Sequence, residues 1–418
     1  MTHNDRSRRR RRRDAPRREQ RRPQSILPAP RLVQSAAEFQ EMMAVLRGQP
    51  LLAVDTESDS LFRYYPRVCL VQVSTPASEE TARPTPADPV PTVDFLVDVL
   101  RLRDIQPLGD LLADPQVEVI LHAAENDIRL FQRDFGFYVT RIFDTQLAAR
   151  ILGRKGVGLA AMLREEFGVL SDKRMQRTNW GRRPLTPEQM TYAQIDTHYL
   201  PALRERQIGA LKAAKRWEEA QEAFRLLEDL RYEEPTEERT FWSMKRVRDV
   251  PAEDLAVLEA LWTWREETAQ RLNRPPFKVL RDEVLVALAQ ERPSNRSALQ
   301  QVRGLSAQQA DRFGRELLDV IREGALRPPP EPPPYNGRDD RRLEPAEQAR
   351  YDALRAWRTQ LAQSRGVDPD IVFSNDILAQ IAVLQPKSVD ELASLPAIGP
   401  WKARTYGPAI LRLLEGRK

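Results

Sequence analysis

One short stretch constrains the fold of this chain more than any other: Leu51–Glu57, an apolar run that ends in two carboxylates. Uninterrupted apolar residues are typical of a strand buried inside a sheet. Asp55 and Glu57 are two residues apart, so both side chains leave an extended backbone on the same face, where like charges repel. The stretch therefore predicts either half of a metal site or a strand that leaves the core into a polar turn.

The segments around this strand predict an α/β domain. A helix is expected from Ser35 toward Gly48, because Ser35 and Glu38 have the spacing of a capping box. A second helix is expected over Ala124–Phe135. β-Branched and apolar residues predict three more strands, at 67–74, 92–99 and 117–121. Strands that alternate with helices indicate a sheet flanked by helices.

Two later segments supply further carboxylates. Asp127 lies in the first turn of the helix that leaves a strand, where open sheets gather ligands, although the helix dipole also favours an acid there. Tyr192 and Asp196 lie four residues apart in a helix expected over Thr186–Leu203, so they project side by side. A packed tyrosine beside a solvated aspartate would show the same spacing. His122, at the strand end, is expected to support a ligand rather than to be one.

Taken in order, these acids and the Tyr-x-x-x-Asp pair resemble the DEDD superfamily of 3′-to-5′ exonucleases. Three further blocks are similar to the ribonuclease D family, namely Phe143–Ala149, Asp172–Trp180 and Arg183–Leu185. The resemblance covers roughly residues 30–210. It implies a ribonuclease H-like fold, with a mixed sheet flanked by helices.

The resemblance also implies a two-metal site. Asp55 would bridge two divalent cations, Glu57 and Asp196 would complete the site of the ion that activates water, and Asp127 would hold the second ion through water. Tyr192 would orient or deprotonate the attacking water. Ligands that are all oxygen atoms favour Mg²⁺ or Mn²⁺ over structural zinc.

Substrate contacts are harder to predict, because many relatives carry an aromatic residue where this chain has Ser58. Phe62, Tyr64 or Tyr65 could stack on the terminal base instead, or could simply pack a turn. Basic residues before the last helix of the site could meet phosphates, namely Lys173, Arg174 and Arg177. Gln72 and Asp144 are expected to be structural.

The second half of the chain contains a repeat of 93 residues. Leu258–Arg265 aligns with Tyr351–Arg358, and small-residue turns recur at Val302–Ser306 and Leu395–Gly399. A polyproline spacer, Pro328–Pro334, separates the two copies. The copies resemble HRDC domains. Backbone amides near Ile398–Lys402 could bind a phosphate, or the modules could be a scaffold that shapes an entrance ring.

The expected organisation has six parts. They are an Arg-rich tail (1–24), the exonuclease domain (25–210), a charged helical connector (211–247), a first HRDC domain (248–326), a Pro-rich linker (327–340) and a second HRDC domain (341–418). The tail has a formal charge of +8, whereas the whole chain has a net charge of +5. The tail should therefore be disordered, and it could contact phosphates or merely aid solubility.

The sequence thus predicts a metal-dependent 3′-5′ exoribonuclease that hydrolyses structured RNA such as tRNA precursors to nucleoside 5′-monophosphates. A DNA substrate and a catalytically silent RNA-binding adaptor are the alternatives. A single cysteine, Cys69, and the lack of a run long enough for a membrane span suit the cytoplasm and no membrane partner. A monomer is expected.

Overall fold

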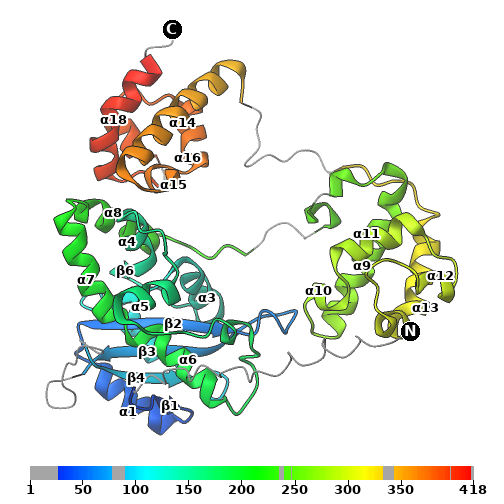
Figure 1. The fold of residues 1–418 in the computed structure, drawn as a ribbon, viewed down its shortest axis with the longest axis horizontal. Coiled ribbons are helices and arrows are strands. Elements are labelled where there is room, and N and C mark those ends of the chain that lie inside the picture. The colour runs from blue at the N-terminus through cyan, green and yellow to red at the C-terminus, as the bar shows by residue number, and fades with distance from the viewer. Residues whose placement is uncertain are drawn as a thin grey trace, which may run out of the picture.

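The computed structural model describes residues 27–77, 90–234, 240–245, 247–332, 343–395 and 397–415. The Arg-rich tail, residues 78–89 of the Pro-rich insertion and the end of the polyproline spacer lie outside these ranges. Figure 1 shows three parts: one that contains the sheet, and two all-helical modules. The first module lies near one end of strand β2, and the second lies beside helices α4, α7 and α8.

The sheet is mixed, as predicted. Its six strands run in the order β1-β4-β3-β2-β5-β6, with β2 antiparallel to β3 and parallel to β5. The strands are β1 (Arg31–Val33), β2 (Leu51–Ser58), β3 (Val68–Pro76), β4 (Thr92–Val97), β5 (Glu118–Leu121) and β6 (Ile142–Asp144).

The carboxylate-bearing strand β2 is central, because its apolar run is covered on both faces. Leu52, Ala53 and Val54 are fully buried. Asp55 lies opposite Gln72 in the β2–β3 ladder, and the register shifts between Glu57 and Ser58, where regular pairing ends. The strand therefore places its two carboxylates at one end of a packed sheet.

Helices cover both faces of the sheet, and α6 crosses the strands β2, β3 and β4 (Figure 1). The capping box of Ser35 and Glu38 begins α1 as predicted. These helices are α1 (Ala36–Leu46), α2 (Gln106–Leu112), α3 (Glu125–Phe135), α4 (Thr145–Ile151), α5 (Leu159–Phe167), α6 (Pro187–His198), α7 (Leu200–Ala213) and α8 (Trp217–Glu228).

Two expected boundaries were wrong. The strand expected at 92–99 ends at Val97, because Asp98 turns the chain and its carbonyl accepts hydrogen bonds from the amides of Arg101 and Leu102. The helix expected over Thr186–Leu203 ends at His198, and a new helix begins at Leu200. Pro201 explains the break, since it has no amide proton to continue the ladder.

The two modules repeat the same five helices within the described residues. Corresponding helices begin at 252 and 345, 276 and 369, 282 and 375, 296 and 389, and 307 and 400, which confirms the offset of 93. They are α9 (Ala252–Arg271), α10 (Pro276–Val279), α11 (Asp282–Glu291), α12 (Arg296–Leu299) and α13 (Ala307–Gly324), then α14 (Pro345–Arg365), α15 (Pro369–Val372), α16 (Asn375–Leu384), α17 (Val389–Ala393) and α18 (Pro400–Glu415).

A buried arginine recurs at the same place in both modules. Arg265 donates to the Leu280 carbonyl and pairs with Asp282, and Arg358 donates to the Phe373 carbonyl. The repeat is therefore one of internal packing as well as of sequence.

No helix among the described residues is both long and apolar enough to span a lipid bilayer.

A buried ion pair anchors the loop that precedes α6. Arg183 donates to both carboxylate oxygens of Asp98, at 2.6 and 2.7 Å, and also to the Cys69 carbonyl at 2.8 Å. Burial alone would raise the pKa of Asp98, but the hydrogen bonds and charge of Arg183, with a hydrogen bond from Gln34, hold that pKa below its ordinary value. The pair therefore contributes stability above about pH 4 that is lost as the pH falls.

We expect Arg183→Met to lower the free energy of unfolding by about 3 kcal/mol, because it leaves the fully buried Asp98 carboxylate without its main partner. Arg101→Met is the matched control. Arg101 approaches the same carboxylate at 3.8 Å but is about half exposed, so its loss should cost less than about 1 kcal/mol. Urea unfolding measures both, and equal losses would contradict the anchoring role of Arg183.

Candidate active site

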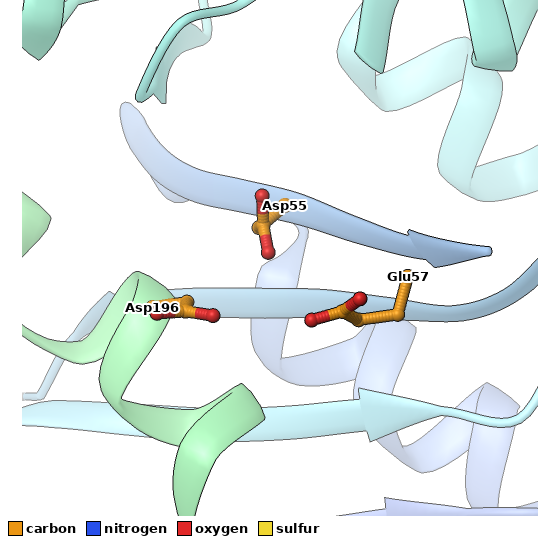
Figure 2. Close-up of side chains that lie close together, drawn as sticks. All are labelled: Asp55, Glu57 and Asp196. Atoms are coloured by element: carbon orange, nitrogen blue, oxygen red, sulfur yellow. The ribbon is translucent and has the colours of Figure 1, made fainter. Parts of the chain in front are cut away.

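Three carboxylates from two elements meet at one end of the sheet. Asp55 and Glu57 come from β2 and Asp196 comes from α6, and one oxygen of each lies within 4.8 Å of the others. Figure 2 shows Glu57 and Asp196 pointing toward each other, with Asp55 between them. Carboxylate oxygens at this spacing form the donor set that a divalent cation prefers.

The start of α6 determines where its two site residues lie. The helix begins after Thr186, as the sequence predicted, with Pro187 in its first turn, and Thr186 and Gln189 form a reciprocal capping box. Tyr192 follows and is 5% exposed, with its ring 6.2 Å from that of Trp180. One turn later Asp196 is 7% exposed, so the helix presents a phenol and a carboxylate to the same site.

The fourth acid, Asp127, lies in the first turn of α3 and is held by a residue that the sequence did not single out. The Thr56 hydroxyl donates a short hydrogen bond to the Asp127 carboxylate. Thr56 lies between Asp55 and Glu57 in the strand, so it leaves β2 on the opposite face. The structure places Asp127 beside the three-carboxylate cluster but not in it.

Asp144 holds the turn from which α3 begins. Its carboxylate accepts hydrogen bonds from the amides of Ala123 and Ala124, and from those of Gln146 and Leu147 at the start of α4. Ala123 has φ 61°, a left-handed conformation that costs about 1–2 kcal/mol for a residue with a Cβ. The structural role expected for Asp144 therefore includes placing the helix that carries Asp127.

Burial and mutual repulsion disfavour the ionised form of these acids and so raise their pKa values. Burial first, and then the charges of Asp127 and Asp196, raise the pKa of Asp55 well above its ordinary value. Burial, followed by the charge of Asp55, does the same for Glu57. Burial raises the pKa of Asp127 to about 7 and that of Asp196 to about 8, and it also raises the pKa of Tyr192. A bound cation would remove this repulsion, so the donor set fits a divalent metal.

A cavity of about 440 Å³ gives access to the cluster. Asp55, Glu57, Tyr192 and Asp196 line one side of it, with Lys173 at another point of the wall. His122 also lines the cavity, and its Nδ1 lies 3.0 Å from the Thr145 hydroxyl. The carboxylate cluster, the Tyr192 phenol and the Lys173 ammonium thus line one cavity, which suits hydrolysis of a phosphate ester.

Comparison with known proteins agrees with this geometry. A family described as 3′-5′ exonuclease matches residues 30–206, and the HRDC domain family matches residues 254–321 and 347–414. The ribonuclease D of Gluconacetobacter diazotrophicus is 30% identical over 93% of this chain and 94% of its own length. This chain belongs to the ribonuclease D family. The ribonuclease D of Pseudomonas paraeruginosa is 31% identical over 88% of this chain and 93% of its own length.

A solved structure supports the same assignment. The crystal structure of Escherichia coli RNase D, described as an exoribonuclease involved in structured RNA processing, superposes with a TM-score of 0.62. It is 25% identical and covers 93% of this chain and 100% of its own. The predicted architecture of a mixed-sheet exonuclease followed by two HRDC domains is therefore confirmed. The protein is a 3′-5′ exoribonuclease of the ribonuclease D family.

The structure separates the three basic residues expected to contact the substrate. Lys173 lines the cavity. Arg174 is exposed and pairs with Asp172 at 2.6 Å, and Arg177 is exposed at the end of a short 3₁₀ helix. Among the three, only Lys173 borders the cavity that contains the carboxylates.

The aromatic cluster after β2 faces the first HRDC module of this ribonuclease D. The Tyr64 hydroxyl donates to Glu266 and accepts from Gln270, while the Lys278 ammonium lies 3.7 Å from the centre of the Phe62 ring. Tyr65 is 65% exposed. The loop that follows Glu57 is thus held by the module, and Tyr65 is the member of the cluster most open to a base.

The expectation that amides near Ile398–Lys402 could bind a phosphate was wrong for this arrangement of the domains. A carboxylate of the catalytic domain, Glu222, already occupies them, as it accepts hydrogen bonds from the amides of Trp401 and Lys402. The sequence placed Glu222 in a charged connector, where an acid is normally solvated. The contact joins two segments nearly 180 positions apart, so local patterns could not show it.

The pKa shifts predict how metal binding depends on pH. Folded metal-free protein holds more protons than unfolded protein between about pH 4 and 8, so its stability should fall as the pH rises through that window. Divalent cations need ionised ligands, so their stabilising effect should grow over the same window. We expect Mg²⁺ to raise the melting temperature more at about pH 8 than at about pH 6.

Thermal melts with EDTA and with saturating Mg²⁺ make this measurement. Asp196→Asn is the control, because it keeps the shape of the side chain but removes one ligand charge, and it should lose most of the Mg²⁺-dependent gain. A gain of the same size at both pH values would contradict the coupling between metal and protons.

Proposed function

We propose that this exoribonuclease trims the 3′ ends of structured RNA, such as tRNA precursors, and releases nucleoside 5′-monophosphates. The observation that carries the proposal is the cluster of Asp55, Glu57 and Asp196 around one cavity, with the Tyr192 phenol beside it. Three close acids with raised pKa values, of which Asp196 is buried and the other two are half-buried, are a costly arrangement unless a cation is bound.

Each carboxylate has a proposed role. As the family resemblance implies, Asp55 would be shared by two cations, and Glu57 and Asp196 would complete the site of the one that activates water. Asp127, oriented by Thr56, would support the second through water. Two divalent ions bound there, Mg²⁺ or Mn²⁺, would neutralise the phosphate, lower the pKa of a coordinated water and stabilise the leaving 3′ oxygen.

Tyr192 is proposed to orient the attacking water. Burial raises its pKa above an already high value, so the phenol keeps its proton near neutral pH and serves as a hydrogen-bonding group rather than as a base. It lies one turn from Asp196 and on the same cavity wall. Lys173, which also lines the cavity, is placed to meet a phosphate of the bound strand.

The substrate is proposed to be RNA with a structured body and a free 3′ end. The relatives from Gluconacetobacter diazotrophicus and Pseudomonas paraeruginosa are ribonucleases by name, and the E. coli structure is described as that of an exoribonuclease involved in structured RNA processing. Two helical modules beside the catalytic domain provide surface that a single-stranded end does not need. The Arg-rich tail, which lies outside the described residues, would add phosphate contacts without base selectivity. The enzyme is proposed to act as a monomer in the cytoplasm.

Two substitutions in α6 test the roles. We expect Asp196→Asn to retain RNA binding but to lower kcat by more than about 100-fold, since even groups that only orient metal ligands are worth about 10–100-fold. Tyr192→Phe should lower kcat by roughly 10- to 100-fold, because it loses an orienting hydrogen bond but no ligand. Trimming of a 5′-labelled RNA, resolved nucleotide by nucleotide, measures both.

The same assay separates the alternatives. Products that comigrate with nucleoside 5′-monophosphates are expected, and DNA of the same sequence should be a poorer substrate. Normal turnover by Asp196→Asn would show that Asp196 is not a required metal ligand. A preference for DNA would overturn the substrate assignment.

A further inference from the structure

The two HRDC modules differ at one corresponding position, the start of their last helix. In the first module Ser306 caps α13: its hydroxyl accepts from the amide of Gln309 at 3.2 Å, and the Gln309 side chain accepts from the amide of Ser306 at 3.1 Å. The residue 93 positions later is Gly399, which has no side chain to cap α18. The amides at the start of α18 must therefore find an acceptor elsewhere.

Glu222, on α8 of the catalytic domain, is that acceptor. One of its oxygens accepts from the amide of Trp401 at 2.5 Å and the other from the amide of Lys402 at 3.0 Å. Glu222 is 3% exposed, and a Cβ built on Gly399 would overlap its carboxylate. Glycine at this position therefore both leaves the helix start uncapped and lets the carboxylate approach it.

Further contacts hold the same two surfaces together. Glu219, one turn before Glu222, pairs with Arg365 of the second module at 2.5 Å, and the Glu219 carboxylate is 1% exposed. Arg216 donates to the Arg365 carbonyl at 2.8 Å. Ile371 of the module packs into a hydrophobic cluster of the catalytic domain. The second module is thus docked by a cap, a buried ion pair and an apolar contact.

The docked module stands beside a groove that adjoins the catalytic cavity. Ala123 and Gln146 line both the cavity and this second hollow of about 470 Å³, whose walls also include Arg129 and Arg150. Arg150 pairs with Asp370 of the second module at 2.5 Å. A wall of the groove next to the active site is therefore tied to the module.

We propose that Glu222 is a specificity-determining residue of this enzyme. By capping α18 across the domain boundary, it holds the second HRDC module as a fixed wall beside the groove that adjoins the catalytic cavity. The proposal rests on the function proposed above. A folded RNA body that rests against a fixed wall presents its 3′ end to Asp55 and its partners and stops at a set distance from them, so this latch both favours folded substrates and defines where trimming ends. A short unstructured RNA does not reach the wall and does not depend on it.

Two full-length variants break the latch in different ways. Glu222→Ala removes the carboxylate. Gly399→Ser gives α18 the local cap that Ser306 gives α13 and forces the Glu222 carboxylate to shift away from the helix start, so the module keeps a satisfied helix start while it loses the Glu222 cap. Ser306→Gly is the matched control, since it alters the corresponding cap in the first module, which Glu222 does not contact, at a cost of only a few tenths of a kcal/mol.

Small-angle scattering and kinetics provide independent readouts. Both latch variants should show a larger radius of gyration than wild type, while Ser306→Gly should not. Their kcat/KM on a short unstructured RNA should stay within about twofold, but the ratio of kcat/KM for a folded precursor with a short 3′ extension over that RNA should fall by about tenfold. The final 3′ ends should also spread over more positions.

Three results would overturn the proposal. Unchanged scattering in both latch variants would show that Glu222 does not hold the module. Undocking with an unchanged or increased ratio would show that the docked module does not set substrate choice. Loss of activity on both RNAs to the same degree would make the latch a stability element only. A wild-type enzyme that degrades neither RNA would instead refute the proposed function, while scattering would still report on the latch.

Discussion

Asp55, Glu57 and Asp196 repel one another, and the elements around them must hold them together against that repulsion. Three acids whose oxygens lie within 4.8 Å of one another are unfavourable in a metal-free fold, as their raised pKa values show. They can be held together only if the elements that carry them are stable for other reasons. The buried run of β2 and the capped start of α6 supply that stability locally. Arg183, which binds Asp98, fixes the loop that precedes α6.

The features that could be predicted from the sequence are those that depend on near neighbours in the chain. The apolar run before Asp55, the start of α6 at Thr186 and the spacing of Tyr192 and Asp196 all depend on local sequence, and the structure brings Asp55, Glu57 and Asp196 together as expected. Asp127 was placed correctly at a helix start, but its link to Thr56 was not foreseen. The motif does contain a usable signal, because a threonine between two site acids must face the other side of the strand.

The features that could not be predicted depend on which distant surfaces meet. Tyr64 looked like a base-stacking candidate, and only the fold shows that its hydroxyl lies between Glu266 and Gln270 of the first module. Glu222 looked like one more acid in a charged helix. The difference between Ser306 and Gly399 was visible in the repeat, but the sequence could not say which group would replace the missing cap. The two modules thus share a fold while each contacts the catalytic domain through its own residues.

The three carboxylates are proposed to form a divalent-metal site for phosphodiester hydrolysis. Anomalous diffraction from crystals grown with Mn²⁺ tests it most directly, because the signal locates the ion without reference to activity. We expect a strong peak bounded by Asp55, Glu57 and Asp196, and a second about 4 Å away on the side of Asp127. An empty cluster with the acids protonated or paired with Lys173, in crystals saturated with Mn²⁺ near pH 8, would contradict it.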